Sequence, residues 1–435
     1  MSLITATEAL ATATIQSAID AAAAAGGGRV TLAEGEHNTG GLVLRSGVEL
    51  HLAAGAVLKP VPDYDAYAGN ISGVIAEGSD RAILYAKGAT NIAITGPGRI
   101  FAPGQAYIVG EDSSVGTFTP AQHRPRVLVF ENCRDVRLDG ITIEDSPMWT
   151  LHLVACKTVS VTRVTVINNE RLPNTDGLVI DSCSDVIVEN VSIATADDGV
   201  CLKTSRQGDT IGVCRNITVR NCQVASQSCA LKLGTESFGD FDNVVFEDCQ
   251  VLRSNRALGI FSRDGGAITN VRFSRISLDC HETADGFWGS GEALTITLAD
   301  RRADRPAGSI SGIVFEDITG SMEGALNIVS TGQAQISDVR LSRIEIFQRP
   351  GKLGTGRYCD MRPTAADLAP AGHLAGRANA WIRGQDGAII GLVPYPGGMP
   401  GLYAPGISDL QLLGVEIHRP KQLPEGWNDA VIIVD

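Results

Sequence analysis

Two short acidic motifs hold the residues of this sequence that are best suited to chemistry, Asn174 to Gly177 and Asp197 to Gly199. In each motif an aspartate precedes a glycine, and an aliphatic residue then opens a short apolar segment. When the two segments are aligned on these glycines, Asp176 and Asp198 take the same position, with Asp197 beside them. If the segments are strands on adjacent turns of the chain, the three carboxylates lie close together.

Three neighbouring carboxylates are costly to assemble, because like charges repel one another. We therefore expect at least one of them to have a raised pKa. A glycoside-cleaving site needs this combination, since one protonated carboxyl donates a proton to the leaving oxygen while ionised carboxylates activate a water molecule. The predicted chemistry is hydrolysis of a glycosidic bond, without a metal or a cofactor.

Two other interpretations of the motifs stay open. Asp, Asn and Gly are common turn formers, so each motif taken singly fits a corner between strands. Clustered carboxylates also suit a calcium ion. The coincidence of the aspartates in one column on consecutive turns favours the catalytic interpretation, and the apolar residues nearby supply few further oxygen ligands for calcium.

The same alignment extends over six segments, each with Gly or Ala followed by Leu or Val. The residues that precede these pairs form one predicted column: Asp176, Asp198, Cys229, Arg256, Glu292 and Gly324. Because side chains alternate between the two faces of a strand, this column is expected to point out of the core and to face solvent.

The segments that position this column alternate with a second pattern, which recurs on the order of every 23 to 31 residues. Each copy begins with a polar turn. Eight residues follow, of which the first, third, sixth and eighth are apolar and the others are of any type. Val159, Val161, Val164 and Val166 form one copy, and others begin at Val136, Val186, Ile217, Val244, Val271, Val339 and Leu410. A repeat of this length and period predicts an all-β fold, a right-handed parallel β-helix in which each apolar position becomes an internal column.

The cysteines follow the same columns. Cys222 and Cys249 fall where other copies have aliphatic residues, which predicts that they are small core fillers. Cys133, Cys156 and Cys183 each lie three residues before the first apolar residue of a copy, in three successive copies. They are predicted to stack, with a metal site as the weaker alternative.

Residues 1–435 are predicted to form a single β-helix domain. Residues 14–32 are its expected N-terminal cap, with an amphipathic helix from Thr14 to Ala25, Thr14 as the N-cap, and a strand at Arg29 to Leu32. Residues from Arg349 to Pro405 interrupt the repeat and are rich in Gly and Pro, which predicts a long loop excursion before the last coil.

The composition limits the choice of partners. The net charge is −13, and no basic cluster with interleaved aromatic residues occurs, so nucleic acid is not an expected partner. No apolar run predicts a membrane span, and no secretion signal is recognised at the N-terminus, which leaves the compartment open between the cytoplasm and, if a leader is removed, the periplasm or the exterior. We expect a monomer.

At this point the sequence resembles a known family, the polygalacturonase-type enzymes of glycoside hydrolase family 28, over most of the chain from about Thr14 to Ile346. The matching segments are Asn174-Thr175-Asp176, Asp197-Asp198, Ile15 to Asp20 followed by Gly26 to Gly28, and Val48 to Leu52 leading into Gly55-Ala56. The resemblance implies a right-handed parallel β-helix and hydrolysis with inversion. It also implies that Asp197 is the general acid and that Asp176 and Asp198 activate the water.

The sequence departs from the family pattern at two places. Cys229 stands where the family has a histidine, within Ser228-Cys229-Ala230, and Gly259-Ile260-Phe261 lacks the Arg and Lys that bind a galacturonate carboxylate. Both departures favour an acidic plant polysaccharide or oligosaccharide other than simple polygalacturonan, such as one of rhamnogalacturonan type.

Further candidates for contact with the sugar lie near the predicted column: Asn174, Lys232, Arg256, Glu292, Cys229, Arg263, His152 and Trp288. Lys232 and Arg256 either replace the missing family cations or only neutralise Asp198 and Glu292. Trp288 either stacks on a sugar ring or packs under a loop. His152 is expected to point outward in the same groove.

The favoured function is therefore an inverting glycoside hydrolase that acts on a pectic polysaccharide or its oligosaccharides. One alternative is a carbohydrate-binding β-helix without catalytic activity. Another is a β-helix polysaccharide lyase, which would use a basic residue and usually calcium.

Overall fold

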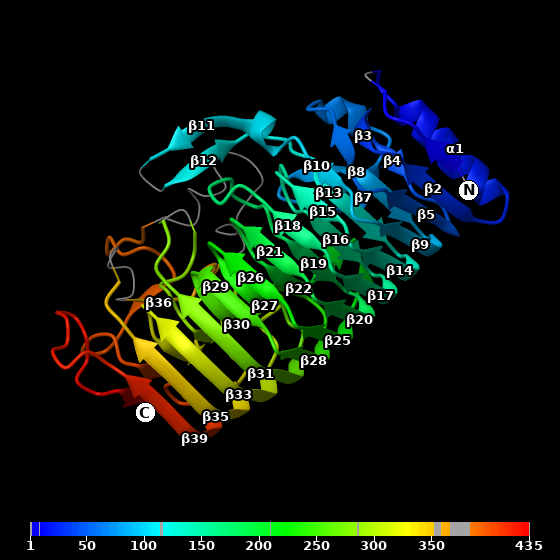
Figure 1. The fold of residues 1–435 in the computed structure, drawn as a ribbon. Helices are drawn as coiled ribbons and strands as arrows, with labels where there is room; N and C mark the ends of the chain where they lie inside the picture. The colour runs from blue at the N-terminus through cyan, green and yellow to red at the C-terminus, as the bar shows by residue number, and fades with distance from the viewer. Residues whose placement is uncertain are drawn as a thin grey trace.

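The structure is a computed structural model that describes residues 2–7, 9–113, 116–208, 210–284, 287–351, 358–365 and 383–434. Its coils succeed one another in a single direction from the N-terminal to the C-terminal end (Figure 1). Each coil contributes strands to three parallel rows, and the fold is the expected right-handed parallel β-helix.

The first row holds strands that begin just after a polar turn: β2 (Gly28–Leu32), β5 (Val48–Leu52), β9 (Thr90–Thr95), β14 (Arg134–Asp139), β17 (Lys157–Thr162), β20 (Ser184–Glu189), β25 (Cys214–Arg220), β28 (Phe241–Glu247), β31 (Ile268–Cys280), β33 (Ile310–Met322), β35 (Ser337–Gln348) and β39 (Ser408–His418). The second row holds β3 (Gly35–Thr39), β6 (Ala56–Pro60), β10 (Arg99–Phe101), β15 (Thr142–Glu144), β18 (Thr165–Ile167), β21 (Ser192–Thr195), β26 (Gln223–Ser226) and β29 (Gln250–Ser254), and it merges with the first row at β31.

The third row forms a separate sheet: β4 (Leu42–Val43), β8 (Ser79–Lys87), β13 (Arg126–Glu131), β16 (Leu151–Val154), β19 (Leu178–Asp181), β22 (Val200–Thr204), β27 (Cys229–Ser237), β30 (Arg256–Ser262), β32 (Leu294–Leu298), β34 (Leu326–Ser330), β38 (Leu402–Tyr403) and β40 (Ile432–Ile433). This row carries the predicted column.

The register predicted from the repeat is confirmed. Val136 pairs with Val159, and Val159 pairs with Val186, so like positions of successive copies face each other. The last two copies pair in the same way, Val339 with Leu410. A coil that begins at Ile313 lies between the copies at Val271 and Val339, although its pattern is broken by Gly320.

The polar turns set where each first-row strand begins. Asp185, Asn216, Asn243 and Asn270 occupy equivalent positions just before the first apolar residue, and all have φ between 54° and 59°. Asn and Asp tolerate this left-handed conformation better than most residues. Their side chains also stack, since Asn243 Nδ2 donates to Asn216 Oδ1 at 2.9 Å.

The core is a set of ladders along the tube. Phe246, Phe273 and Phe315 stack face to face, with ring centroids 4.7 and 5.0 Å apart. The ten cysteines are all buried and free, and Cys222 and Cys249 lie in the core as predicted. The stack of Cys133, Cys156 and Cys183 is held by thiol to carbonyl contacts such as Cys156 Sγ to Phe130 O at 3.2 Å.

Helix α1 (Thr12–Ala24) covers the N-terminal end and buries Ile15 and Ile19. It begins two residues earlier than expected, and Thr14 is not its N-cap, because Ala11 holds that position without a side-chain hydrogen bond. Thr12 instead accepts a hydrogen bond from the backbone of Gly40 at 2.7 Å, which ties the start of the helix to the first coil.

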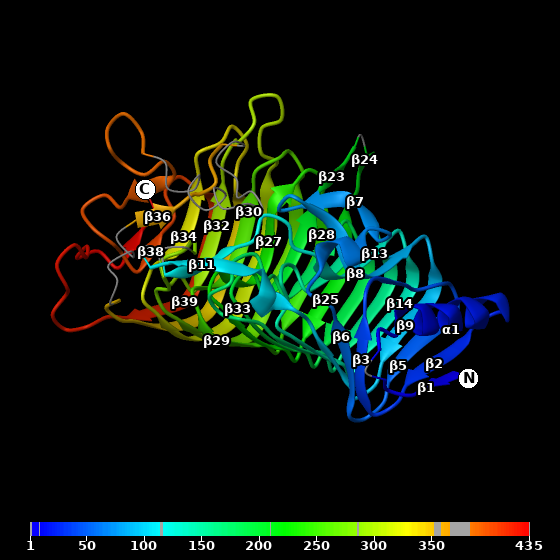
Figure 2. The same ribbon diagram turned by 90° about the horizontal axis from the view of Figure 1, so that it is seen from above.

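Strand β1 (Ser2–Ile4) pairs in parallel with β2 and so extends the first row at the N-terminal end. Other segments lie outside the tube: β7 (Ile71–Ala76), the hairpins β11 (Ile108–Asp112) with β12 (Thr117–Pro120) and β23 (Arg206–Gln207) with β24 (Thr210–Ile211), the pair β36 (Tyr358–Asp360) with β37 (Leu392–Pro394), and the 3-10 helices at Tyr64–Tyr67 and Gly104–Tyr107. Seen from above, β7 and β23 lie next to each other beside the third row, and β36 lies near the C-terminal end of that row (Figure 2). The predicted excursion of residues 349–405 falls partly outside the described residues. Its described parts include β36, β37 and β38.

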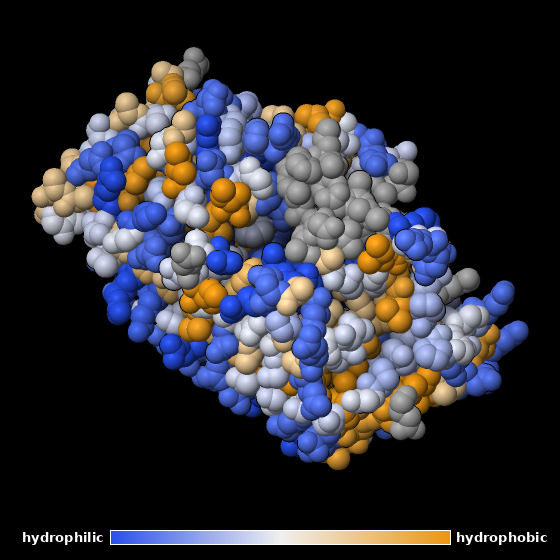
Figure 3. Space-filling model, turned by 180° about the vertical axis from the view of Figure 1, so that it is seen from behind, coloured by the Kyte–Doolittle hydropathy of each residue, from blue (hydrophilic) through white to orange (hydrophobic). Residues whose placement is uncertain are grey.

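The surface in Figure 3 is largely hydrophilic, with hydrophobic residues in scattered patches. Within the described ranges, no helix combines the length and the apolar character needed to cross a membrane.

The phenylalanine ladder gives a test of the core. Replacing Phe273 by Ala removes a side chain of 0% exposure stacked on both sides, and it is expected to lower the free energy of unfolding by about 3–5 kcal/mol. Phe101, which is 40% exposed, is the matched control, and its replacement by Ala is expected to cost far less. Denaturant unfolding measures both, and equal losses would contradict the assigned ladder.

Candidate active site

The predicted column lies in register on the third row. Leu178 pairs with Val200, Val200 with Leu231, and Leu231 with Leu258, so the residues two positions earlier are neighbours on successive coils. Cys229 and Arg256 are themselves paired. The column points out of the tube, as expected, but it is covered rather than open to solvent, with Asp176 at 3% and Asp198 at 2% exposure.

Asp176, Asp197 and Asp198 converge on one point. Each has a carboxylate oxygen within 4.8 Å of an oxygen of the other two. Asp197 is half-buried, and its carboxylate accepts hydrogen bonds from the backbone N–H groups of Asn174 and Asp198, both at 3.1 Å. The turn that holds these backbone groups therefore fixes the direction in which Asp197 points.

The three carboxyl groups have different surroundings. Asp198 accepts hydrogen bonds from Lys232 Nζ at 2.6 Å and from the hydroxyl of Ser228 at 3.2 Å. Burial, together with the negative charges of Asp197 and Asp198, holds the pKa of the Asp176 carboxyl well above its usual range. The expectation of a raised pKa is confirmed, and Asp176 is the residue that shows it.

A pocket of about 480 Å³ opens over the cluster. Its walls come from three coils and two outer segments: Glu77, Asn174, Asp176, Asp197, Asp198, Lys203, Ser228, Lys232, Thr235, Glu236 and Trp288. This volume includes space that is open to solvent. Of the predicted sugar-contacting residues, Asn174, Lys232 and Trp288 line the pocket.

Lys203 and Glu236 are pocket residues that the sequence did not single out. Lys203 Nζ lies 2.7 Å from Glu236 Oε2 and 4.8 Å from the centroid of the Trp149 ring. Although burial opposes its charge, Glu236 raises the pKa of Lys203 above the usual value. Lys203 lies three residues after Val200 on the third row. Its contact with Glu236 follows only from the pairing of β22 with β27.

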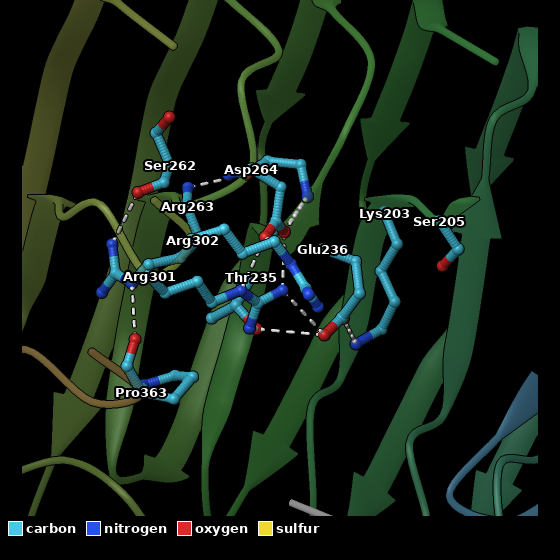
Figure 4. A network of polar contacts seen from close by, with 12 residues as sticks. Lys203, Ser205, Thr235, Glu236, Ser262, Arg263, Asp264, Arg301, Arg302 and Pro363 are labelled. Atoms are coloured by element: carbon cyan, nitrogen blue, oxygen red, sulfur yellow. Dashed lines mark hydrogen bonds and ion pairs between the residues drawn. The ribbon is translucent and has the colours of Figure 1, made fainter. Parts of the chain in front are cut away.

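The Lys203–Glu236 pair continues into a larger polar network (Figure 4). Arg301 bridges Glu236 at 3.5 Å and Asp264 at 2.6 Å, and Arg302 also contacts Asp264 at 3.2 Å. Cations therefore outnumber anions on this side of the pocket, in contrast to the net charge of −13 for the whole chain.

Arg256 and Glu292 lie next to the pocket in the buried part of the column. Arg256 contacts Glu292 Oε2 at 3.4 Å and Asp360 Oδ2 at 3.2 Å, so two carboxylates neutralise it. Glu292 is fully buried and accepts a hydrogen bond from the backbone N–H of Ser290 at 2.6 Å. Neither side chain is among those that line the pocket.

Arg263, Cys229 and His152 are also enclosed. Arg263 donates to the backbone carbonyls of Met361 and Pro363, at 2.9 and 3.1 Å, and so fastens the excursion to the tube (Figure 4). Burial raises the pKa of the Cys229 thiol to about 12. His152 points out of the tube but is fully buried, and burial lowers its pKa to about 4.

Asn174 is set by residues that the sequence did not reveal. It has a φ of 61°, and its amide oxygen accepts a hydrogen bond from Arg124 Nη2 at 2.9 Å. Arg124 is 1% exposed and also donates to the carbonyl of Pro173 at 2.7 Å. This buried arginine fixes the turn before Asp176, and a lone Arg in one sequence carries no signal of that role.

Trp288 lies at the other side of the pocket, where its carbonyl accepts a hydrogen bond from Asn255 at 3.1 Å. Its indole nitrogen has no acceptor among the described residues.

The three aspartates are also spaced closely enough to hold a metal ion, the alternative considered for the motifs. Lys232 already occupies one oxygen of Asp198, and a second ammonium group, that of Lys203, lies on the same pocket wall. Both positive charges oppose the binding of a divalent cation at this point. The arrangement suits proton transfer between carboxyl groups better than metal coordination.

Comparison with known proteins identifies the family. The chain is 26% identical over 240 residues to a probable polygalacturonase of Arabidopsis thaliana, which covers 53% of this chain and 49% of that protein. It is 24% identical over 357 residues to an endo-polygalacturonase of Pectobacterium carotovorum subsp. carotovorum, covering 77% of this chain and 84% of the relative. The chain thus spans about half the length of the plant relative.

A solved structure with the same fold is the family 28 exopolygalacturonase of Yersinia enterocolitica, with a TM-score of 0.69 at 15% identity, covering 100% of this chain and 78% of that one. The family model described as glycosyl hydrolases family 28 matches residues 68–359, which include the column and all three aspartates. The chain therefore belongs to glycosyl hydrolase family 28.

Proposed function

We propose that this protein hydrolyses a glycosidic bond in a pectic polysaccharide or its oligosaccharides, with a substrate of rhamnogalacturonan type as the finer possibility. The observation that carries the proposal is the meeting of three carboxyl groups from two coils in one pocket. Asp176 has a raised pKa, and Asp198 accepts a hydrogen bond from the ammonium group of Lys232 at 2.6 Å. One proton donor beside ionised carboxylates is what glycoside hydrolysis requires.

The roles are proposed from membership of the family. Asp197, which is the least buried of the three, is assigned as the general acid that protonates the leaving oxygen. Asp176 and Asp198 then activate the attacking water. Because the groups are strongly coupled, the cluster is best described as holding one shared proton.

In the free enzyme the shared proton rests on Asp176, the group whose pKa is raised by burial and by its charged neighbours. Binding of a sugar brings the glycosidic oxygen to Asp197, and the proton moves there across the short distance between the carboxyl groups. The leaving oxygen takes that proton, while Asp176 receives one from the attacking water. The cluster thus ends the reaction with the same number of protons.

The spacing bears on the stereochemistry. The oxygens of the cluster lie closer together than the roughly 6.5–9.5 Å usual between the two carboxyl groups of an inverting enzyme. Inversion is supported by family membership, and it requires that Asp176 and Asp198 hold the water as a pair on the side opposite Asp197. The anomeric configuration of the product decides between inversion and retention.

The two lysines of the pocket are its candidates for contact with an acidic sugar. Lys203 and Lys232 lie in its wall, each already beside a carboxylate, Glu236 and Asp198. Asn174 is proposed to donate a hydrogen bond to a sugar hydroxyl, and Trp288 to contact the sugar ring. Arg256 and Arg263 are proposed to act indirectly, because both are buried and saturated by protein partners.

The lyase alternative requires a neutral amine or guanidine as base. Although burial opposes the charge of Lys232, the adjacent Asp198 raises its pKa above the usual value, and Glu236 does the same for Lys203. Both lysines therefore remain protonated, which disfavours them as bases for elimination.

Leaving-group chemistry tests which carboxyl is the acid. Asp197→Asn is expected to reduce kcat on a natural oligosaccharide by about 10²–10⁴-fold, but much less on a glycosyl fluoride, whose leaving group needs no proton. Asp176→Asn is expected to lose activity on both, because the water is not activated. Initial rates on the two substrates give the comparison, and the reverse pattern would assign the acid to Asp176.

Asp176→Asn is also expected to stabilise the fold. Because the folded-state pKa of Asp176 is raised, its proton contributes stability that is complete below the ordinary aspartate pKa and is lost as pH rises through the raised value. An asparagine at this position cannot ionise, so Asp176→Asn does not lose this stability as pH rises. Its gain in Tm over the wild type should therefore grow from acidic to neutral pH. Asp304→Asn, at an exposed position, is the control, and a gain independent of pH would count against the buried charge.

The product distinguishes hydrolase from lyase. NMR of the first product is expected to show a saturated sugar with inverted anomeric configuration, formed at the same rate after treatment with EDTA. An unsaturated product that depends on added calcium would establish the lyase, and a retained configuration would overturn the assigned roles. No product from any pectic substrate would favour a binding protein.

A further inference from the structure

The outer face of the third row is covered along its length, not only at the pocket. On the N-terminal side of Asp176 the outward residues Arg126 and His152 are both 0% exposed. On the C-terminal side Glu292 and Asn327 are also 0% exposed. A polysaccharide that lay along the row through the site would need these positions to be open.

The N-terminal wall of the pocket is built by β7 and the turn that follows it. Ala76 packs against Met148, Trp149 and Val179, which are outward residues of the coils just before and at Asp176. Glu77 follows directly and lines the pocket. The backbone of β7 is tied down by a hydrogen bond from Gly73 N to Glu131 Oε2 at 3.0 Å, so this wall is part of the folded tube.

The C-terminal wall is built by Trp288 and the described part of the excursion. Gly289 donates its backbone N–H to Asp360 Oδ2 at 2.9 Å, and Asp360 in turn contacts Arg256 at 3.2 Å. Residues 361 to 363 are fastened by Arg263. Cys359 and Met361 add an apolar cluster with Tyr395 over the outward side of β32 and β34.

We infer that the site accepts only the end of a sugar chain and releases a small product of fixed size, which makes the protein exo-acting. This inference rests on the proposed function. Glu77 and Trp288 line the pocket, and beyond it along the row the outward residues of the described coils are buried on both sides, so a bound chain is expected to leave the site away from the tube. An internal segment of a polymer needs two exits from the site.

The test uses the full-length protein with polygalacturonate, rhamnogalacturonan and oligosaccharides of both types tagged at the reducing end. On whichever substrate is hydrolysed, reducing ends are expected to accumulate while viscosity stays nearly constant, and one small product should appear from the first turnovers. A rapid fall in viscosity with an early ladder of intermediate lengths would overturn the inference and leave the proposed function standing. If no substrate were cleaved, the proposed function itself would be overturned, and the inference with it.

Opening the two walls gives a second test. In the double variant Glu77→Gly and Trp288→Ala both bounding side chains are removed, and the fraction of internal cuts in a tagged oligosaccharide is expected to rise severalfold. Ile75→Ala, at a 70% exposed position on the same β7 strand, is the matched control and should leave the product pattern unchanged. Circular dichroism and Tm confirm folding, and an unchanged pattern in the folded double variant would show that these walls do not set the mode of cleavage.

Discussion

The structure depends on one electrostatic constraint, the placement of three carboxyl groups within 4.8 Å of one another in a nearly buried position. Fully ionised, they would repel one another strongly in surroundings of low polarity. Two features relieve this repulsion: the raised pKa of Asp176, which favours its protonated form, and the ammonium group of Lys232 beside Asp198. The same arrangement supplies an acid and a base, so the cost of assembling the site is also the source of its proposed chemistry.

The parallel β-helix is well suited to bear this cost. Adjacent coils stack at the spacing of hydrogen-bonded strands, which brings Asp176 and Asp198 together without a long loop. The Phe246–Phe273–Phe315 ladder and the aliphatic columns inside the tube keep the coils from slipping past one another. Register in the core therefore determines the distance between the catalytic candidates on the outside.

Much of this could be predicted from the sequence because the repeat is regular. The columns of Val159 and Val186, and the alignment of Asp176 with Asp198, follow from a period that needs no gap within a copy. The repeat pattern does not predict the coil at Ile313, since Gly320 stands where an aliphatic residue is expected. The helix start differed because Thr12, not Thr14, bonds to the first coil.

The rest of the site could not be predicted, because it depends on contacts between distant segments. Glu236 reaches Lys203 only through the pairing of β22 with β27, and Asp360 reaches Arg256 from an excursion about a hundred residues later in the chain. The burial of His152 depends likewise on outer segments that follow no repeat. The repeat in the sequence predicts the β-helix itself. The segments that cover its third row are placed by contacts between distant parts of the chain.

The central claim, that the carboxyl cluster holds a proton on Asp176, can be measured by difference infrared spectroscopy between the wild type and Asp176→Asn. At a pH where an exposed aspartate is ionised, the account predicts a carbonyl band of a protonated carboxyl in the wild type that disappears in the variant. A wild-type spectrum that shows only ionised carboxylates at that pH would contradict it.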